Sequence, residues 1–124
     1  MKLKSDPRHI KRIDLMRFLF TWQFQKGKAP VKISEVVNRL DEIDELIRQS
    51  APDRPTSQIN KIDLAILRLA IFELIINKEP PKVVIDEAVE LGKEFGADSS
   101  SGFINGVLGK VVQLKGIKTN ANNK

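Results

Sequence analysis

Apolar residues recur along this chain at helical spacing, and no stretch alternates apolar with polar residues for long enough to predict a strand. Proline and glycine residues separate the helical segments from one another. The pattern therefore predicts an all-α protein, folded as a compact helical bundle.

The first predicted helix begins after Pro7, which suits a first-turn position, and ends near Gln25. A second amphipathic helix is expected to begin near Ser34 and to use one apolar stripe as far as Ile47. Residues 51–58 contain two prolines and form either a linker or a single helical turn.

The segment 62–76 carries only three charged residues, so nearly every face of that helix is apolar and it belongs at the centre of the bundle. A further helix is predicted over 82–95, with Gly96 as its C-terminal cap. The serine run 99–101 supplies capping oxygens for a last helix, which closes near Gly116. No internal repeat is visible.

Two glycines of the last helix, Gly106 and Gly109, are interpreted as sites of close helix packing, because no strand precedes them to form a phosphate loop. The acidic residues of the helix over 82–95 are expected on its solvated face, where catalysis is the less favoured interpretation. They are Asp86, Glu87, Glu90 and Glu94.

The net charge of +5 is unevenly placed. Residues 1–12 carry five basic side chains and one acidic one, and residues 109–124 carry four basic ones, so residues 13–108 are left with a charge of −3. A basic end on an acidic body suggests two different partners. The alternative is that the charged ends only keep a small domain soluble.

The composition also limits the classes of function. A chain of 124 residues suffices for one domain, expected over residues 1–116, with a basic arm at 1–12 and a disordered tail at 117–124. Cysteine is absent, and the sole histidine, His9, is expected to be exposed at the edge of the arm, so neither a catalytic triad nor a metal site is predicted. We expect no enzyme activity and no cofactor. With no secretory or membrane-spanning segment, a cytoplasmic location is expected.

The basic arm is the stronger functional signal. Arg8, Lys11 and Arg12 are spaced by three and four residues, so a helical first turn places Arg8 beside both others, where they can bind several phosphates. Preference for particular RNA bases would require aromatic side chains on which unstacked bases pack. The candidates are Phe103 and Trp22. Core packing is the alternative for each, and for Trp22 it is the favoured interpretation.

Three segments go beyond generic helical patterns: RHIKRIDLMRFLFTWQF at 8–24, IDLAILRLAIFELI at 62–75, and EPPKVVIDEAVELGKEFGADSSSGFINGVLGKV at 79–111. Together they resemble the NusB family of bacterial transcription antitermination factors. The positions that carry the resemblance are Asp63, Ala65, Ile66, Leu67, Arg68, Ala70, Glu73, Leu74, Pro81, Val84, Asp86, Glu87, Ala88, Leu91, Lys93, Phe95, Gly96, Phe103, Asn105, Gly106 and Leu108.

The resemblance implies a non-enzymatic protein that binds boxA-type single-stranded RNA of nascent transcripts, including rRNA. Its implied partners are a small-subunit ribosomal protein acting as NusE and the RNA polymerase antitermination complex. The position that faces the ribosomal protein falls on Asp63. The RNA-binding positions expected from the arm and from the resemblance are Lys2, Lys4, Arg8, His9, Lys11, Arg12, Ser99 and Phe103.

The chain also departs from the family pattern. Only QKGKAPVKI stands where relatives commonly have an additional helix, which predicts a shortened N-terminal half. Leu64 replaces a common basic residue, and Ser99 and Gly102 lack charges that some members carry. A second hypothesis is therefore a helical protein-interaction module without specific RNA binding.

Overall fold

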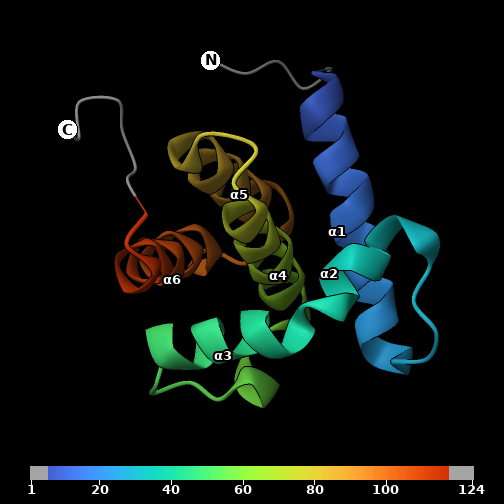
Figure 1. Cartoon of the computed structure of the whole chain (residues 1–124), viewed down its shortest axis with the longest axis horizontal. Coiled ribbons are helices and arrows are strands. Elements are labelled where there is room, and N and C mark those ends of the chain that lie inside the picture. Colours follow the sequence, from blue (N-terminus) through green and yellow to red (C-terminus); the bar gives the residue numbers. More distant parts are fainter. Residues whose placement is uncertain (1–5, 118–124) are drawn as a thin grey trace.

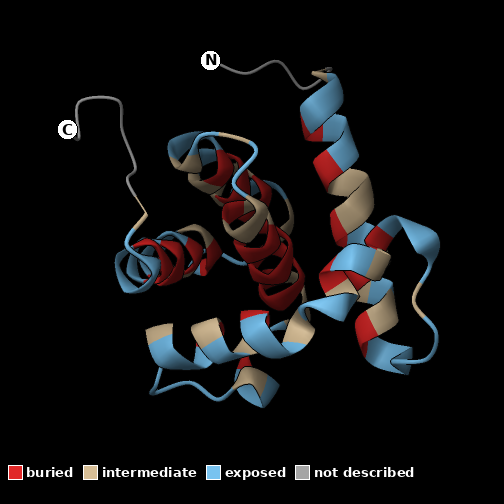
Figure 2. Cartoon of the chain, in the orientation of Figure 1, coloured by how far each residue is buried: buried red, intermediate tan, exposed pale blue. Residues whose placement is uncertain are grey.

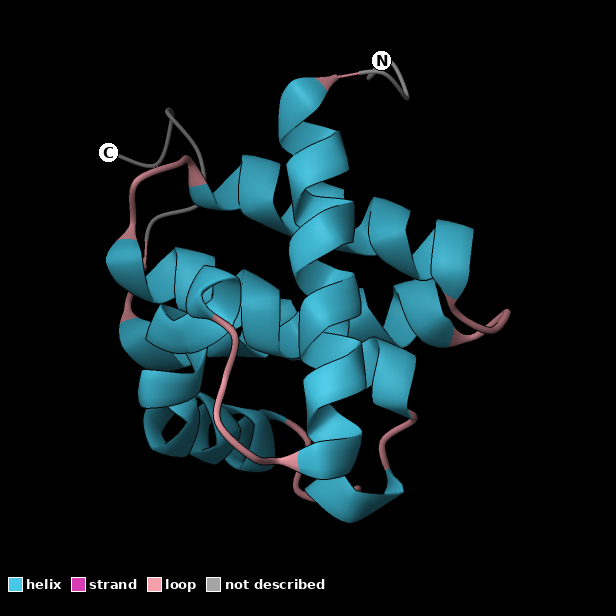
Figure 3. Cartoon of the chain, turned by 90° about the vertical axis from the view of Figure 1, so that its right-hand side faces the viewer, coloured by secondary structure: helices cyan, strands magenta, loops and turns pink. Residues whose placement is uncertain are grey.

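The computed structural model describes residues 6–117, and every regular element within that range is a helix (Figures 1 and 3). The predicted all-α class is confirmed. The elements in chain order are α1 (Pro7–Gln25), the 3-10 helix η1 (Val31–Ile33), α2 (Ser34–Asn38), α3 (Leu40–Ser50), the 3-10 helix η2 (Thr56–Gln58), α4 (Lys61–Ile76), α5 (Pro81–Phe95) and α6 (Ser100–Lys115).

Helix α4 occupies the centre of the bundle, as its apolar sequence predicts. It packs against α1, α3, α5 and α6, and its residues 63–72 are all buried, which Figure 2 shows as a nearly continuous red ribbon. The side chain of Asn60 caps its first turn by accepting hydrogen bonds from the backbone N–H groups of Ile62 and Asp63. Asn77 ends it in the left-handed conformation that asparagine tolerates.

Helix α1 runs antiparallel to α4 along one side of the bundle. Near its C-terminal end the amide of Gln23 donates to the carbonyl oxygen of Lys61 at 3.0 Å, and its Oε1 accepts from Arg68 at 3.1 Å. Arg68 in turn holds Asp44 of α3 with two hydrogen bonds. These contacts give the buried amide of Gln23 hydrogen-bond partners for its oxygen and its nitrogen, and they join α1, α3 and α4 through polar groups.

The second predicted helix is divided into two, which corrects the sequence-based expectation. Arg39 leaves the helical region, with φ −106° and ψ 14°, and its N–H donates to the carbonyl oxygens of Val36 and Val37. The change of direction lets α2 pack against η1 and α4 while α3 packs against α4 and α6. Val36 and Ile43 are consequently both buried. Tertiary packing here outweighs a continuous helical pattern.

The prolines of the segment 51–58 precede a single helical turn, η2. Of the two alternatives for this segment, a linker or a single helical turn, the helical turn is the one observed. Among the described helices, none has both the length and the apolar character that crossing a bilayer requires. The predicted tail lies outside the described residues from position 118 onward.

The glycines that permit close packing of α5 on α6 are different from those expected. A Cβ atom at Gly92 would lie 2.9 Å from Cδ1 of Ile104, whereas Gly106 and Gly109 have no atom of another element within 4 Å of such a Cβ. Gly96 follows α5 in an extended conformation instead of a left-handed one. Glycine is needed at position 96 for steric reasons, because a Cβ atom there would collide with Oγ of Ser100.

The serine run also caps α6 differently from the prediction. Ser99 occupies the N-cap position, but its side chain makes no capping hydrogen bond. Instead Oγ of buried Ser100 accepts a hydrogen bond from the N–H of Ala97 at 2.9 Å, which fixes the turn between α5 and α6. Gly116 ends α6 with φ +66°, as predicted.

Candidate nucleic-acid interface

The candidate interface begins at the basic first turns of α1. The helix begins directly after Asp6, whose side chain accepts a hydrogen bond from the N–H of Arg8 at 2.8 Å. That hydrogen bond holds the pKa of Asp6 below its usual value, although partial desolvation acts in the opposite direction. The predicted arm residues Lys2 and Lys4 lie outside the described residues.

The four described arm residues that were predicted to bind RNA point in two directions. Arg8 and Lys11 are exposed, whereas His9 and Arg12 are buried, with exposed fractions of 3% and 7%. The expectation that His9 is exposed is therefore wrong. The periodicity that brings the cations together on one helix also turns half of them toward the protein interior.

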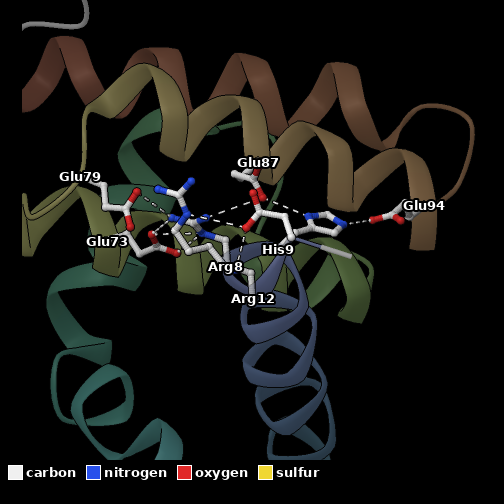
Figure 4. A network of polar contacts seen from close by, with 8 residues as sticks. Arg8, His9, Arg12, Glu73, Glu79, Glu87 and Glu94 are labelled. Atoms are coloured by element: carbon white, nitrogen blue, oxygen red, sulfur yellow. Dashed lines mark hydrogen bonds and ion pairs between the residues drawn. The ribbon is translucent and has the colours of Figure 1, made fainter. Parts of the chain in front are cut away.

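His9 joins α1 to α5 through two carboxylates, as Figure 4 shows. Its Nδ1 lies 3.0 Å from Oε1 of Glu87, and its Nε2 lies 2.8 Å from Oε1 of Glu94. In the protonated form the ring can donate to both carboxylates at once, and in the neutral form only to one. Glu87 is itself buried, so its expected place on the solvated face of α5 is wrong.

Arg12 makes a two-pronged contact with Glu73 of α4, in which Nε and one terminal nitrogen donate to the two carboxylate oxygens at 3.0 and 2.7 Å. Glu79 and Glu87 lie 3.5 and 3.7 Å from its terminal nitrogens (Figure 4). Burial lowers the pKa of Arg12, but the hydrogen bond and charge of Glu73 and Glu79 outweigh burial and leave that pKa raised. Arg12 is thus charged and occupied by partners within the chain.

The exposed cations of the arm face an open cleft between α1, α2 and the end of α4. Arg8 and Lys11 line this cleft together with Lys32 and Lys78, which the sequence did not single out. Lys32 pairs with Asp14 at 2.9 Å, whereas Lys11 and Lys78 form no ion pair with any described residue. Glu35, Glu73 and Glu79 also line the cleft, so its charge is mixed.

The second predicted RNA-contacting region lies at the start of α6. Ser99 is exposed, and Phe103 is half-buried with its side chain packed against the core. The guanidinium of Arg54, from the loop between α3 and η2, lies over the Phe103 ring at 4.2 Å from its centroid. No sequence pattern indicated this pairing, because the two residues are 49 positions apart by their numbers.

Two other candidates are partly or fully buried. Asp63 is 4% exposed, and its Oδ1 has no hydrogen-bond partner among the described groups. Trp22 is half-buried against the core and donates from Nε1 to the carbonyl oxygen of Gly27 at 2.8 Å. The favoured core interpretation of Trp22 agrees with this placement.

Nothing in the described part of the chain gathers three or more histidine or acidic side chains in a geometry that could hold a metal ion. The charged groups of the site are arranged as ion pairs that fix α1 on α4 and α5. Two features remain directed outward: the cations that line the cleft, and the guanidinium of Arg54 over the Phe103 ring at the start of α6. Both are suited to binding an anionic polymer.

The fold and site define an all-α helical protein in which the basic first turns of α1 are held against α4 and α5. The NusB family model matches residues 12–113, and the chain therefore belongs to the NusB family.

Known relatives agree with this assignment. The chain is 55% identical over 73 residues to the transcription antitermination protein NusB of Chloroflexus aggregans, an alignment that covers 56% of this chain and 49% of that protein. It is 41% identical over 89 residues to the protein of the same name from Lachnoclostridium phytofermentans, covering 71% and 67%. The chain spans about half the length of several of these curated relatives.

Solved structures show the same fold. NusB of T. maritima superposes with a TM-score of 0.79 at 27% identity, covering 91% of this chain and 93% of that one. The antitermination factors NusB and NusE have been solved in complex with dsRNA, and a chain of that complex superposes with a TM-score of 0.74 at 21% identity, covering 88% and 99%. At that identity the likeness establishes the NusB-type bundle alone.

Proposed function

We propose that this chain is a non-enzymatic transcription antitermination factor that binds boxA-type single-stranded RNA of nascent transcripts, including rRNA. It does so together with a small-subunit ribosomal protein acting as NusE, within an RNA polymerase antitermination complex. Membership of the NusB family supports this proposal, as do the names of its relatives and the NusB–NusE–dsRNA complex of a similar fold. We further propose one cytoplasmic domain over residues 1–116.

The observation that carries the RNA proposal is the division of the arm. His9 and Arg12 fix the first turns of α1 on α4 and α5, and this anchorage holds Arg8 and Lys11 outward. Cations held in place lose less conformational entropy when they meet a phosphate than cations on a free arm. Arg8 and Lys11 therefore supply phosphate contacts, while His9 and Arg12 contribute by positioning them.

Fluorescence anisotropy with a boxA-like RNA, with and without the ribosomal protein, tests the proposal. Replacing both Arg8 and Lys11 by alanine is expected to weaken binding and to make the logarithmic salt slope shallower by roughly 0.7 for each phosphate that the variant no longer neutralises. The matched control replaces Arg39 and Arg48, which are exposed and paired with glutamates on α3, and removes the same charge. Equal affinity for scrambled RNA in both conditions would refute specific RNA binding.

The interaction-module hypothesis gains support from two arm residues that already have partners within the chain: Arg12 is paired with Glu73, and the His9 ring lies against Glu87 and Glu94. Its signature is RNA binding that does not change when Arg8 and Lys11 are replaced, combined with retained binding of the ribosomal protein. The anisotropy titration with both components separates the two functions directly.

Asp63 is proposed as the acidic position of the partner surface, at the N-terminal end of α4. Because the Asp63 side chain is buried, it affects a partner in one of two ways: it becomes exposed by a local rearrangement of the chain, or it sets the shape of the surface above it. Asp63→Asn is then expected to change the affinity for the ribosomal protein while leaving the melting temperature within a few degrees of the original. A fall in stability with unchanged affinity would assign Asp63 to the fold alone.

A further inference from the structure

The closest cation–ring contact among the described residues joins the loop after α3 to the start of α6. The guanidinium carbon of Arg54 lies 4.2 Å from the centroid of Phe103, compared with 5.4 Å for Arg17 over Phe95 and 4.9 Å for Lys32 over Phe18. Arg54 is exposed, and Phe103 is half-buried against the core. The ring therefore packs inward while a planar cation covers it from outside.

The loop holds Arg54 in this place through its backbone. The N–H of Arg54 donates to the carbonyl oxygen of Ala51 at 3.1 Å and closes a turn whose second residue is Pro52. Pro55 follows and disfavours the helical conformation at Arg54. Two prolines and one hydrogen bond thus limit the positions that the side chain can reach, and less entropy is lost when a ligand binds it.

The side-chain donors of Arg54 make no hydrogen bond within the described chain. Arg12 and Arg68 direct their donors to Glu73 and Asp44, whereas the side chain of Arg54 makes no hydrogen bond or ion pair with a described residue. A guanidinium carries five N–H donors around a planar surface. The central carbon of the guanidinium lies over the Phe103 ring while Arg54 is exposed, so part of the group remains open to a ligand from solvent.

We infer that Arg54 and Phe103 form a layered stacking site for an unpaired nucleobase, in which the base stacks on the outer side of the guanidinium. Unstacked RNA bases pack on aromatic rings and on arginine planes, and the donor edge can at the same time reach a phosphate or a base edge. This inference rests on the proposed RNA function and adds a residue from a different loop to it. Exposed Ser99, one turn before Phe103 along α6, offers a hydroxyl to the same ligand.

A nucleic acid fits this arrangement better than a protein does. A carboxylate of a protein partner would pair with the donor edge but would leave the flat outer surface unused. A base uses both the surface and the donors. Replacing Arg54 by lysine separates a protein ligand from a nucleic acid, because lysine keeps the positive charge and lacks the planar surface.

The test measures binding of the boxA-like RNA to the whole chain, with the ribosomal protein present, for Arg54→Ala, Arg54→Lys and Arg48→Ala. Arg48 is exposed and pairs with Glu45, so its loss changes the net charge as Arg54→Ala does. Stacking predicts a roughly tenfold loss of affinity for Arg54→Ala and a loss of roughly fivefold for Arg54→Lys with an unchanged salt slope. Arg48→Ala is expected to change affinity by less than about twofold.

Each other result overturns the inference. If Arg54→Lys binds RNA as tightly as the original chain, Arg54 makes only a charge contact. If Arg54→Ala and Arg48→Ala have the same RNA affinity, Arg54 makes no contact with the RNA. Weaker binding of the ribosomal protein with unchanged RNA affinity would assign the pair to a protein interface. If the unaltered chain binds boxA-like and scrambled RNA equally, the proposed function fails and this inference fails with it, whereas the first three results leave that function standing.

Discussion

His9 bridges α1 and α5 from a buried position, with its Nδ1 atom 3.0 Å from Oε1 of Glu87. A histidine that looks like part of a basic, solvent-facing arm in the sequence is thus a structural contact. The same is true of Arg12, which meets Glu73. In this NusB-family chain the described part of the arm is therefore anchored, and the outward cations next to His9 and Arg12 carry the proposed RNA contacts.

His9→Ala is expected to lower the free energy of unfolding by about 2 kcal/mol, because two carboxylates, one of them buried, lose a polar partner. Urea denaturation measures this loss. Lys11→Ala, on the neighbouring exposed position, serves as the control and is expected to stay within about 0.5 kcal/mol of the original chain. Equal stability of both variants would contradict the anchoring role.

Arg12→Ala is expected to cost about 3 kcal/mol, because truncation leaves Glu73 without its two-pronged partner in a largely buried site. Arg12→Lys should recover only part of the loss, since a lysine cannot donate two parallel hydrogen bonds. Thermal or urea unfolding gives the comparison, with Arg8→Ala as the exposed control. Stability of Arg12→Lys equal to that of the original chain would show that charge alone matters.

The Asp6 cap predicts a pH dependence of stability. The pKa of Asp6 is lowered in the folded chain, so its contribution is present above the unfolded value of about 3.9 and is lost as the pH falls through the lower folded value. Asp6→Asn keeps a capping acceptor and removes the titration. Melting temperatures from about pH 2 to pH 6 should therefore fall less steeply at the acid end for Asp6→Asn, and parallel curves would contradict the role of the carboxylate.

Two glycine substitutions are expected to change the free energy of unfolding in opposite directions. Gly96→Ala should destabilise the chain by about 2 kcal/mol, because its Cβ would collide with Ser100 beside the α5–α6 turn. Gly106→Ala should stabilise it by about 1 kcal/mol, because the position is helical, exposed and free of nearby atoms. Chemical denaturation of the two variants tests the pair, and loss of stability in Gly106→Ala would reveal a contact that the monomer does not show.

Most of the helices could be predicted from local patterns. The proline at the start of α1, the all-apolar faces of α4 and the glycine after α6 each act within one or two turns, and these boundaries agree with the structure. The break at Arg39 has no such signal, since the apolar stripe continues through it. It depends on how α2 and α3 meet α4 and α6, which are distant in the sequence.

The candidate site was only partly visible in the sequence. Helical spacing correctly brings the arm cations onto neighbouring turns, but which of them turn inward depends on the glutamates of α4 and α5. The acidic face of α5 is predicted to be solvated from the sequence, because nothing local shows that His9 and Arg12 of α1 meet Glu87 there. Arg54 was missed for a similar reason, because a lone arginine between prolines gives no signal until the fold places Phe103 beneath it.

The anchored arm also has a consequence for the order of events during synthesis. His9 and Glu94 are separated by 85 positions, so their contact closes a loop that includes most of the chain. The ribosome makes the arm before α5, but His9 cannot reach Glu94 until the end of α5 has emerged. His9 is therefore among the last residues to take up its final geometry, and a chain that ends before α5 carries the arm cations on an unanchored segment.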